Sequence, residues 1–284
     1  MFRGKFLVYF MIILAIIGCS KSAEELIKDL ESDNTATRRR AGTALIQGRG
    51  GPEAVKGLIK LLESDNERSV FLATQILGTR SDTTAVQPLG RMIDNPNPNI
   101  RSRAAWSLGS IGHDSSLPYL VKALEDSVAE VRHSAITAIG YIHYQPAVKY
   151  IFKMFRDEAD SVRAAAVRSL WMYRSYKDAG VMAADFAVPL NDKSDAVRYV
   201  TVQALGYNVD PDNTVAGEML IETLRDQNKH VRIESIISLS KIKYKPAVPH
   251  LKKMYDLATL DEEYAISEAI KKITDEDFPP LEEN

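Results

Sequence analysis

The chain has 284 residues, of which 45% are hydrophobic and 26% charged, a composition that fits a globular protein and excludes a disordered or fibrous one. Its formal net charge is −2, so it offers no broad basic field, and we expect no nucleic-acid partner. Cys19 is the only cysteine, which excludes an intrachain disulfide and a metal site built from cysteines.

The N-terminal segment has the pattern of a secretory signal. Arg3 and Lys5 precede an uncharged stretch, Phe6–Ile17. Its twelve residues would span about 18 Å as a helix. A transmembrane helix needs roughly 20 residues, which span about 30 Å. A positive start followed by a short apolar stretch predicts a signal peptide over residues 1–18.

The end of this stretch carries a motif, Ile16-Ile17-Gly18-Cys19, which resembles the bacterial lipobox. The resemblance implies that Cys19 is acylated and becomes the new N-terminus, with residues 19–22 forming the lipidated end and a short linker. It implies a lipoprotein with palmitate-type chains, anchored in the cell envelope. The residue after the cysteine is Ser20 and not an aspartate. By analogy with bacterial lipoproteins, the absence of an aspartate at this position favours transport to the outer membrane in a cell that has one. An uncleaved anchor and a simple signal peptide remain alternatives.

The rest of the chain is repetitive. Five segments align on one arginine, namely Ile100–Gly109, Val131–Gly140, Val162–Trp171, Val197–Gly206 and Val231–Ser240. Poorer copies occur at Thr37–Ile46, Ser69–Gly78 and Glu262–Ile273. The anchor positions 38, 70, 101, 132, 163, 198 and 232 are 31 to 35 residues apart. A period of this length is typical of a stacked repeat protein.

Each repeat is expected to be a pair of helices. In the anchored segments, apolar or small residues recur at helical spacing, and the position six after the anchor is mostly small. Gly78, Gly109, Gly140 and Gly206 are expected to cap these helices at their C-terminal ends. Other amphipathic segments alternate with them and predict the first helix of each pair, with Pro52, Pro146 and Pro246 at helix starts: Pro52–Glu63, Ser116–Asp126, Pro146–Phe155 and Pro246–Tyr255.

This pattern resembles the short HEAT-like repeats shared with the phycobilisome lyase family. The resemblance implies an all-α fold, a right-handed α-solenoid of about seven to eight helix pairs over residues 23–275, followed by an acidic tail at 276–284. It also implies a structural ladder in which an aspartate ending one helix and an arginine in the next join adjacent repeats. The positions that match are Asp126, Arg132, Asp157, Arg163, Asp192, Arg198, Asp226 and Arg232. We favour this structural role for the arginines over an anion-binding row.

No catalytic or metal-binding motif is found in the sequence. The histidines show no metal-ligand spacing, and no nucleophile elbow occurs. The glycines of the segment Gly48–Gly51 lack the flanking strand of a phosphate-binding loop and predict a turn between helices. We therefore expect neither an enzyme nor a bound cofactor.

One surface feature points to binding. In HEAT-like solenoids the second helices line the concave face, and the positions one, five and nine after the anchor form a stripe along them. Its residues are of the kinds that form protein-binding hot spots: Phe71, Trp106, His133, Tyr141, Arg168, Met172, Tyr199 and Tyr207, continued by Ile233 and Ile237, with Tyr144 and Tyr244 at the turns. Ordinary packing between helices is the alternative. Trp171, which replaces the repeat's glycine, is expected to be packed.

Together these features favour a membrane-anchored scaffold or adaptor that binds a protein or peptide on its concave face. A structural spacer or subunit of an envelope complex, and a lyase-like ligand carrier, are the alternatives. The sequence does not identify the partner.

Overall fold

A computed structural model describes residues 21–174, 181–207 and 214–279, the side chain at position 174 excepted. The predicted signal peptide and Cys19 lie outside these ranges. The described residues form α-helices and short 3-10 turns and contain no strand. The prediction of an all-α solenoid is therefore confirmed for this part of the chain. No helix within it is long and apolar enough to cross a bilayer.

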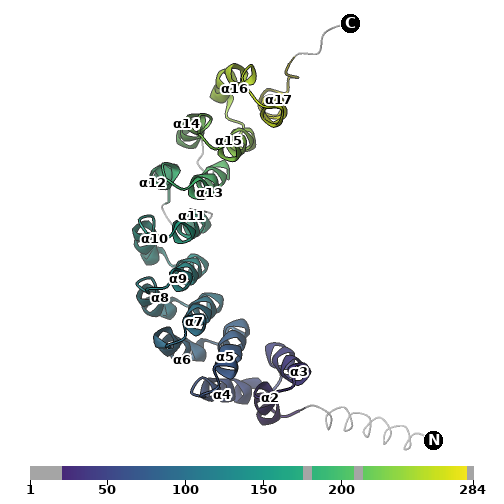
Figure 1. The fold of residues 1–284 in the computed structure, drawn as a ribbon, viewed down its shortest axis with the longest axis vertical. Coiled ribbons are helices and arrows are strands. Elements are labelled where there is room, and N and C mark those ends of the chain that lie inside the picture. Colours follow the sequence, from purple (N-terminus) through teal and green to yellow (C-terminus); the bar gives the residue numbers. More distant parts are fainter. Residues whose placement is uncertain (1–20, 175–180, 208–213, 280–284) are drawn as a thin grey trace, which may run out of the picture. The chain divides into compact units, whose positions relative to one another are not determined.

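The chain divides into two compact units, and the boundary along the sequence falls after Ser116. The described part of the first unit holds three helix pairs (Figure 1). They are α2 (Ala23–Leu30) with α3 (Thr35–Ile46), α4 (Gly51–Leu61) with α5 (Glu67–Arg80), and α6 (Val86–Arg91) with α7 (Pro98–Ile111). The second helices α3, α5 and α7 pack on one another in chain order.

The described part of the second unit holds five pairs. They are α8 (Leu117–Ala123) with α9 (Ala129–Ile142), α10 (Val148–Met154) with α11 (Asp160–Arg174), α12 (Ala187–Leu190) with α13 (Asp195–Gly206), α14 (Thr214–Thr223) with α15 (Lys229–Lys241), and α16 (Val248–Tyr255) with α17 (Leu260–Thr274). Each second helix contacts the second helix of the next pair. The degenerate copy predicted at 262–273 is α17.

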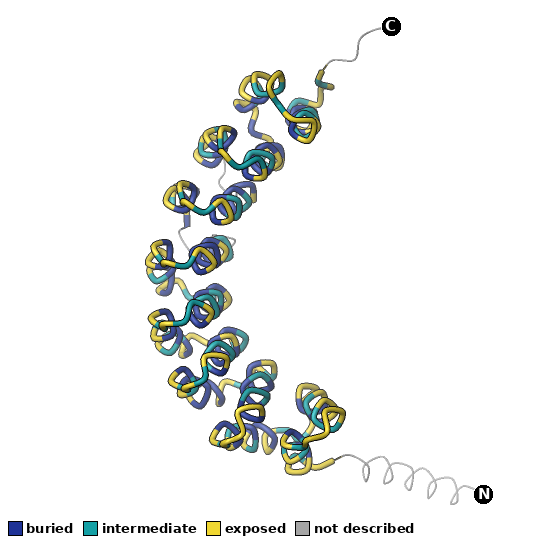
Figure 2. The backbone as a smooth tube through the Cα atoms, viewed as in Figure 1, coloured by how far each residue is buried: buried dark blue, intermediate teal, exposed yellow. Residues whose placement is uncertain are grey.

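The apolar core of each unit lies where its helices face one another, and the outward sides of the first helices are exposed (Figure 2). Leu58 of α4 and Leu77 of α5 are fully buried in the first unit, and Ile151 of α10 and Leu170 of α11 are fully buried in the second. Burying apolar side chains between stacked pairs stabilises each unit, since one pair cannot cover its own apolar face.

Side-chain caps explain where several helices begin. Ser22 and Glu25 form a capping box at the start of α2, and Thr259 and Glu262 do so at α17. Several of the first helices begin differently from the prediction. Pro146 and Pro246 lie in 3-10 turns, Gln145–Ala147 and Lys245–Ala247, that lead into α10 and α16. The turn predicted at the run of glycines joins α3 to α4, and Gly48 and Gly50 there have positive φ angles of 89° and 79°.

The expected glycine caps are wrong. Gly78, Gly109 and Gly140 lie inside α5, α7 and α9, and Gly206 is the last helical residue of α13. The structure gives a different reason for three of these glycines, which is the close approach of the next second helix. A Cβ atom on Gly78 would lie 2.5 Å from Cβ of Ser107, and one on Gly206 would lie 2.3 Å from Oγ of Ser238. The small residue of one repeat therefore packs on the glycine of the preceding repeat.

Candidate binding surface

The predicted stripe lies on the second helices, and none of its ten residues is buried. The exposed members are Trp106, Tyr141, Arg168, Tyr207 and Ile237, and the half-buried ones are Phe71, His133, Met172, Tyr199 and Ile233. Of the two tyrosines predicted to extend it, Tyr144 is half-buried and Tyr244 is buried. A Cβ on Gly217 would lie 2.4 Å from the Tyr244 ring, so that tyrosine belongs to the packing of its repeat.

In the first unit the stripe is organised by an arginine that the sequence reasoning missed. The guanidinium carbon of Arg103 lies 4.7 Å from the ring centroid of Phe71 and 5.4 Å from that of Trp106. A cation so placed is attracted to both rings. Burial lowers the pKa of Arg103, but a guanidinium remains charged at neutral pH. Arg103 therefore joins α5 and α7 into one aromatic and cationic patch.

In the second unit the stripe continues over α11, α13 and α15 as a connected cluster. The rings of Trp171 and Tyr207 are 5.1 Å apart between centroids, and Nζ of Lys241 lies 4.7 Å from the Tyr207 centroid. Nζ of Lys241 also lies 3.3 Å from a carboxylate oxygen of Glu234. The Tyr199 hydroxyl donates to the other Glu234 oxygen at 3.2 Å.

Trp171 therefore takes part in the surface cluster, although the sequence predicted it to be packed; it is half-buried. His133 lies near Arg168 in the same unit. Burial, together with the charge of Arg168, lowers the pKa of His133, so this imidazole is neutral at pH 7. The stripe thus presents aromatic rings and a few fixed charges, a composition that suits protein contacts.

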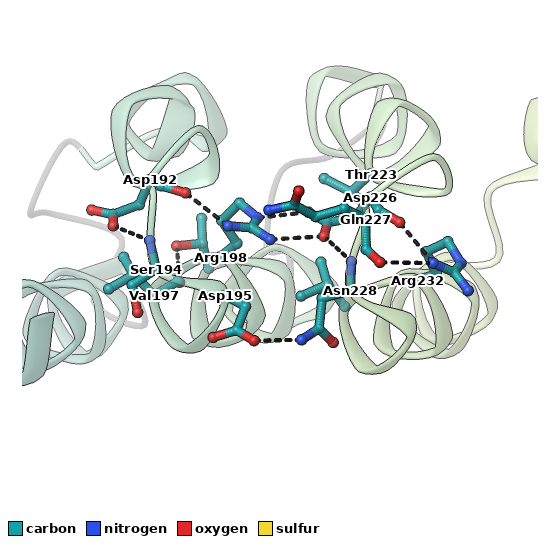
Figure 3. A network of polar contacts seen from close by, with 12 residues as sticks. Asp192, Ser194, Asp195, Val197, Arg198, Thr223, Asp226, Gln227, Asn228 and Arg232 are labelled. Carbon is teal, nitrogen blue, oxygen red and sulfur yellow. Dashed lines mark hydrogen bonds and ion pairs between the residues drawn. The ribbon is translucent and has the colours of Figure 1, made fainter.

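In the second unit, arginine–carboxylate pairs join adjacent repeats at the turns between first and second helices (Figure 3). Arg132 donates from Nε and Nη2 to both carboxylate oxygens of Asp157, at 2.8 and 2.9 Å, and Arg163 pairs with Asp192 in the same way. Figure 3 shows the next pair, Arg198 with Asp226. Each of these arginines also donates from Nη1 to backbone carbonyls of its own repeat. Bidentate geometry of this kind fixes the spacing of neighbouring repeats.

The last rung of the ladder differs from those before it. The backbone carbonyl of Asp126 accepts a hydrogen bond from Nη1 of Arg132, and the Asp126 side chain accepts one from the amide of Val128 at 2.9 Å. Arg232 pairs with Glu262, which the sequence reasoning had not assigned, through Nε at 2.7 Å. The Thr259-x-x-Glu262 capping box was the available signal for this acid.

The ladder carboxylates are buried yet charged. Burial alone would raise the pKa of Asp157, but hydrogen bonds from Arg132 and from the Ala159 amide, with the charge of Arg132, outweigh it and lower that pKa. The pKa values of Asp192, Asp226 and Glu262 are lowered by the same balance of causes. Because Asp157, Asp192 and Asp226 each accept two hydrogen bonds from an arginine of the preceding repeat, these three rungs are structural groups.

No group of histidine and acidic side chains within the described residues could hold a metal ion.

Comparison with known proteins identifies the repeats. The sequence profile of the HEAT repeats matches residues 71–136, 121–183 and 185–278. The solved structure of YibA from Escherichia coli is 21% identical, with a TM-score of 0.60 over 88% of this chain and 91% of that one. The CpcE–CpcF complex of phycocyanin lyase from a Nostoc species is 19% identical (TM-score 0.47, 84% of this chain, 96% of that one). Human deoxyhypusine hydroxylase is 20% identical (TM-score 0.41, 89% and 96%).

No curated protein matches the sequence significantly. The structural likeness to YibA supports the fold alone at this level of identity. The repeat profile covers more than half of the chain. This chain therefore belongs to the HEAT-repeat family.

Proposed function

We propose that this protein is a membrane-anchored scaffold or adaptor that binds a protein or peptide along the stripe of its second helices. The observation that carries the proposal is the accessibility of all ten stripe residues. Soluble surfaces seldom keep several aromatic side chains accessible on neighbouring helices without a use. Aromatic and arginine side chains also dominate the energetics of protein interfaces.

The organisation of the stripe supports the proposal further. Arg103 holds Phe71 and Trp106 together, and Lys241 lies against Tyr207. In the second unit the arginine–carboxylate ladder fixes neighbouring repeats. A preorganised surface loses less entropy when a partner binds, which favours affinity.

The membrane anchor is inferred from the N-terminal sequence, residues 1–19. Acyl chains on Cys19 would hold the repeats at an envelope membrane, outer where the cell has one, because each buried methylene adds about 0.8 kcal/mol of membrane affinity. A tethered adaptor would meet its partner at the membrane surface.

The test is affinity capture from detergent-solubilised membranes with the full-length protein, read by quantitative mass spectrometry. A double variant, Trp106→Ala with Tyr141→Ala, should lose a specifically enriched protein by at least about tenfold, since removing a hot-spot side chain removes 2 kcal/mol or more. These side chains are 38% and 51% exposed, so their loss should leave the unfolding midpoint nearly unchanged.

Phe152→Ala is the matched control. Phe152 is an aromatic residue of α10, outside the stripe, with the same 38% exposure as Trp106. The control should capture as the natural protein does. Equal recovery by all three proteins would overturn the binding stripe and would favour a structural spacer in an envelope complex.

A further inference from the structure

A groove in the second unit lies apart from the stripe. It has a volume of about 370 Å³, and α14 to α17 and the turns between them supply its walls. Its charged lining consists of Arg225, Arg232, Lys253 and Glu262, with His250 beside them. Its apolar lining consists of Ile221, Leu224, Met254, Leu257 and Ala258. A volume of this size suits a small ligand.

Arg232 is the last arginine of the ladder and differs from the others. In Arg132, Arg163 and Arg198 both Nε and Nη2 donate to a carboxylate. In Arg232 only Nε does so, because the second oxygen of Glu262 accepts from the amide and hydroxyl of Thr259. Nη2 of Arg232 has no hydrogen-bond partner among the described residues.

The exposure of Arg232 agrees with this difference. Its side chain is 23% exposed, against 6–8% for the three fully paired arginines. Arg225 and Lys253, the other cations of the groove, form no ion pair within the described part of the chain. The groove therefore combines an open guanidinium edge with two uncompensated cations.

The preceding repeat supplies an internal comparison. The equivalent groove there is lined by Lys193, Arg198 and Arg225 together with Asp192, Glu222 and Asp226, so its formal charges cancel. In the last groove three cations, Arg225, Arg232 and Lys253, face one carboxylate, which leaves a formal charge of +2 from these four groups. The two grooves lie at equivalent places in successive repeats, and of the two only the last has an excess of positive charge.

We propose that this groove binds a small phosphomonoester. The phosphate carries about −1.5 to −2 charges at pH 7, which matches the excess positive charge. Its oxygens would accept from Nη2 of Arg232, where the earlier rungs place a carboxylate oxygen. Leu257 is 93% exposed at the groove, so it and Met254 offer a surface to an apolar substituent of the ligand. This site does not depend on the stripe.

The experiment is calorimetric titration of the purified full-length protein with phenyl phosphate, inorganic phosphate and benzoate. We expect saturable binding of phenyl phosphate. Inorganic phosphate should bind with about tenfold lower affinity, because it lacks the apolar group. Leu257→Ala should remove that difference. Inorganic phosphate binding as tightly as phenyl phosphate would assign the groove to free phosphate and overturn the phosphomonoester.

Arg225→Gln with Lys253→Gln should weaken phenyl phosphate by at least about tenfold, and both residues lie outside the ladder, so folding should be kept. The control, Lys193→Gln with Lys149→Gln, removes two charges elsewhere in the same unit and should bind normally. An equal loss in the control would show non-specific attraction and overturn the site. Benzoate as tight as phenyl phosphate, or no saturation at millimolar ligand, would do the same.

Discussion

At the scale of single residues, the ladder separates buried from exposed ion pairs on one arginine. Arg132 contacts Asp157, whose side chain is 5% exposed, and Glu158, whose side chain is 84% exposed. Removing one partner of a buried pair leaves an uncompensated charge, whereas an exposed pair is already screened by water. The two acids therefore provide a matched test.

We predict that Asp157→Asn lowers the free energy of unfolding by about 3–5 kcal/mol, the range for breaking a buried pair. Glu158→Gln should lower it by about 1 kcal/mol or less. Urea denaturation followed by circular dichroism measures both. Similar losses for the two variants would mean that burial does not decide the strength of the rung.

The same residues predict a dependence on pH. The folded-state pKa values of Asp157, Asp192, Asp226 and Glu262 lie below their ordinary values. Their stabilisation is therefore complete above the unfolded-state pKa values, about 4, and is lost as pH falls through the lower folded-state values. Urea midpoints measured from pH 7 downward should fall steeply below about pH 4, and less steeply in Asp157→Asn. A curve of equal slope in that variant would exclude the rung as the cause.

At the scale of helices, the packing of second helices depends on glycine at their contacts. Alanine at a helix interior normally stabilises by about 0.5–1 kcal/mol relative to glycine. At Gly78 a Cβ would lie 2.5 Å from Cβ and 2.7 Å from Cα of Ser107 on α7, which no side-chain rotation relieves. At Gly42 of α3 the nearest atom would be 3.9 Å away.

We predict opposite signs for the two substitutions. Gly78→Ala should destabilise the protein by about 1–3 kcal/mol through overpacking, in spite of the gain in helix propensity. Gly42→Ala should stabilise it by up to about 1 kcal/mol. Thermal unfolding of both variants measures the sign of each stability change. Stabilisation by Gly78→Ala would show that α5 and α7 do not approach so closely.

The helices and the positions of the stripe residues on them could be predicted from the sequence because both depend on periodicity, whereas the exposure of the stripe could not be separated from packing. Spacings of three and four place Leu77 and Trp106 on different faces of their helices. Features that depend on the next repeat could not be predicted. The purpose of Gly78 becomes visible only beside Ser107, and the bridging role of Arg103 only beside Phe71. The sequence favoured a cap for the glycine because helix ends and close helix contacts select the same residue.

The last acid of the ladder illustrates the same limit. The expected partner was an aspartate that ends a first helix, whereas Glu262 lies in the first turn of α17. Its longer side chain reaches Arg232 and still closes the Thr259 capping box. Both contacts use one carboxylate, and this division leaves Arg232 with its open donor.

At the scale of the whole molecule, the N-terminal motif predicts where the proposed adaptor would act. Arg3 and Lys5, the apolar stretch and Cys19 predict a cleaved and acylated N-terminus. One acyl chain gives only marginal membrane binding, whereas several together give a stable anchor. Membrane attachment should therefore depend on the cysteine thiol and not on the repeats.

We predict that the natural protein sediments with membranes after a high-salt wash, which removes proteins held by charge alone. Cys19→Ser should remain in the soluble envelope fraction, or uncleaved in the membrane, and intact mass spectrometry distinguishes these forms. The natural protein should begin at Cys19 with added acyl mass. A control, Ser20→Ala, changes the neighbouring residue and should be processed normally. An unmodified natural protein that retains residues 1–18 would assign the anchor to the apolar stretch. A cleaved but unacylated protein would show that the repeats are not attached to the membrane, and any partner would then have to be sought in solution.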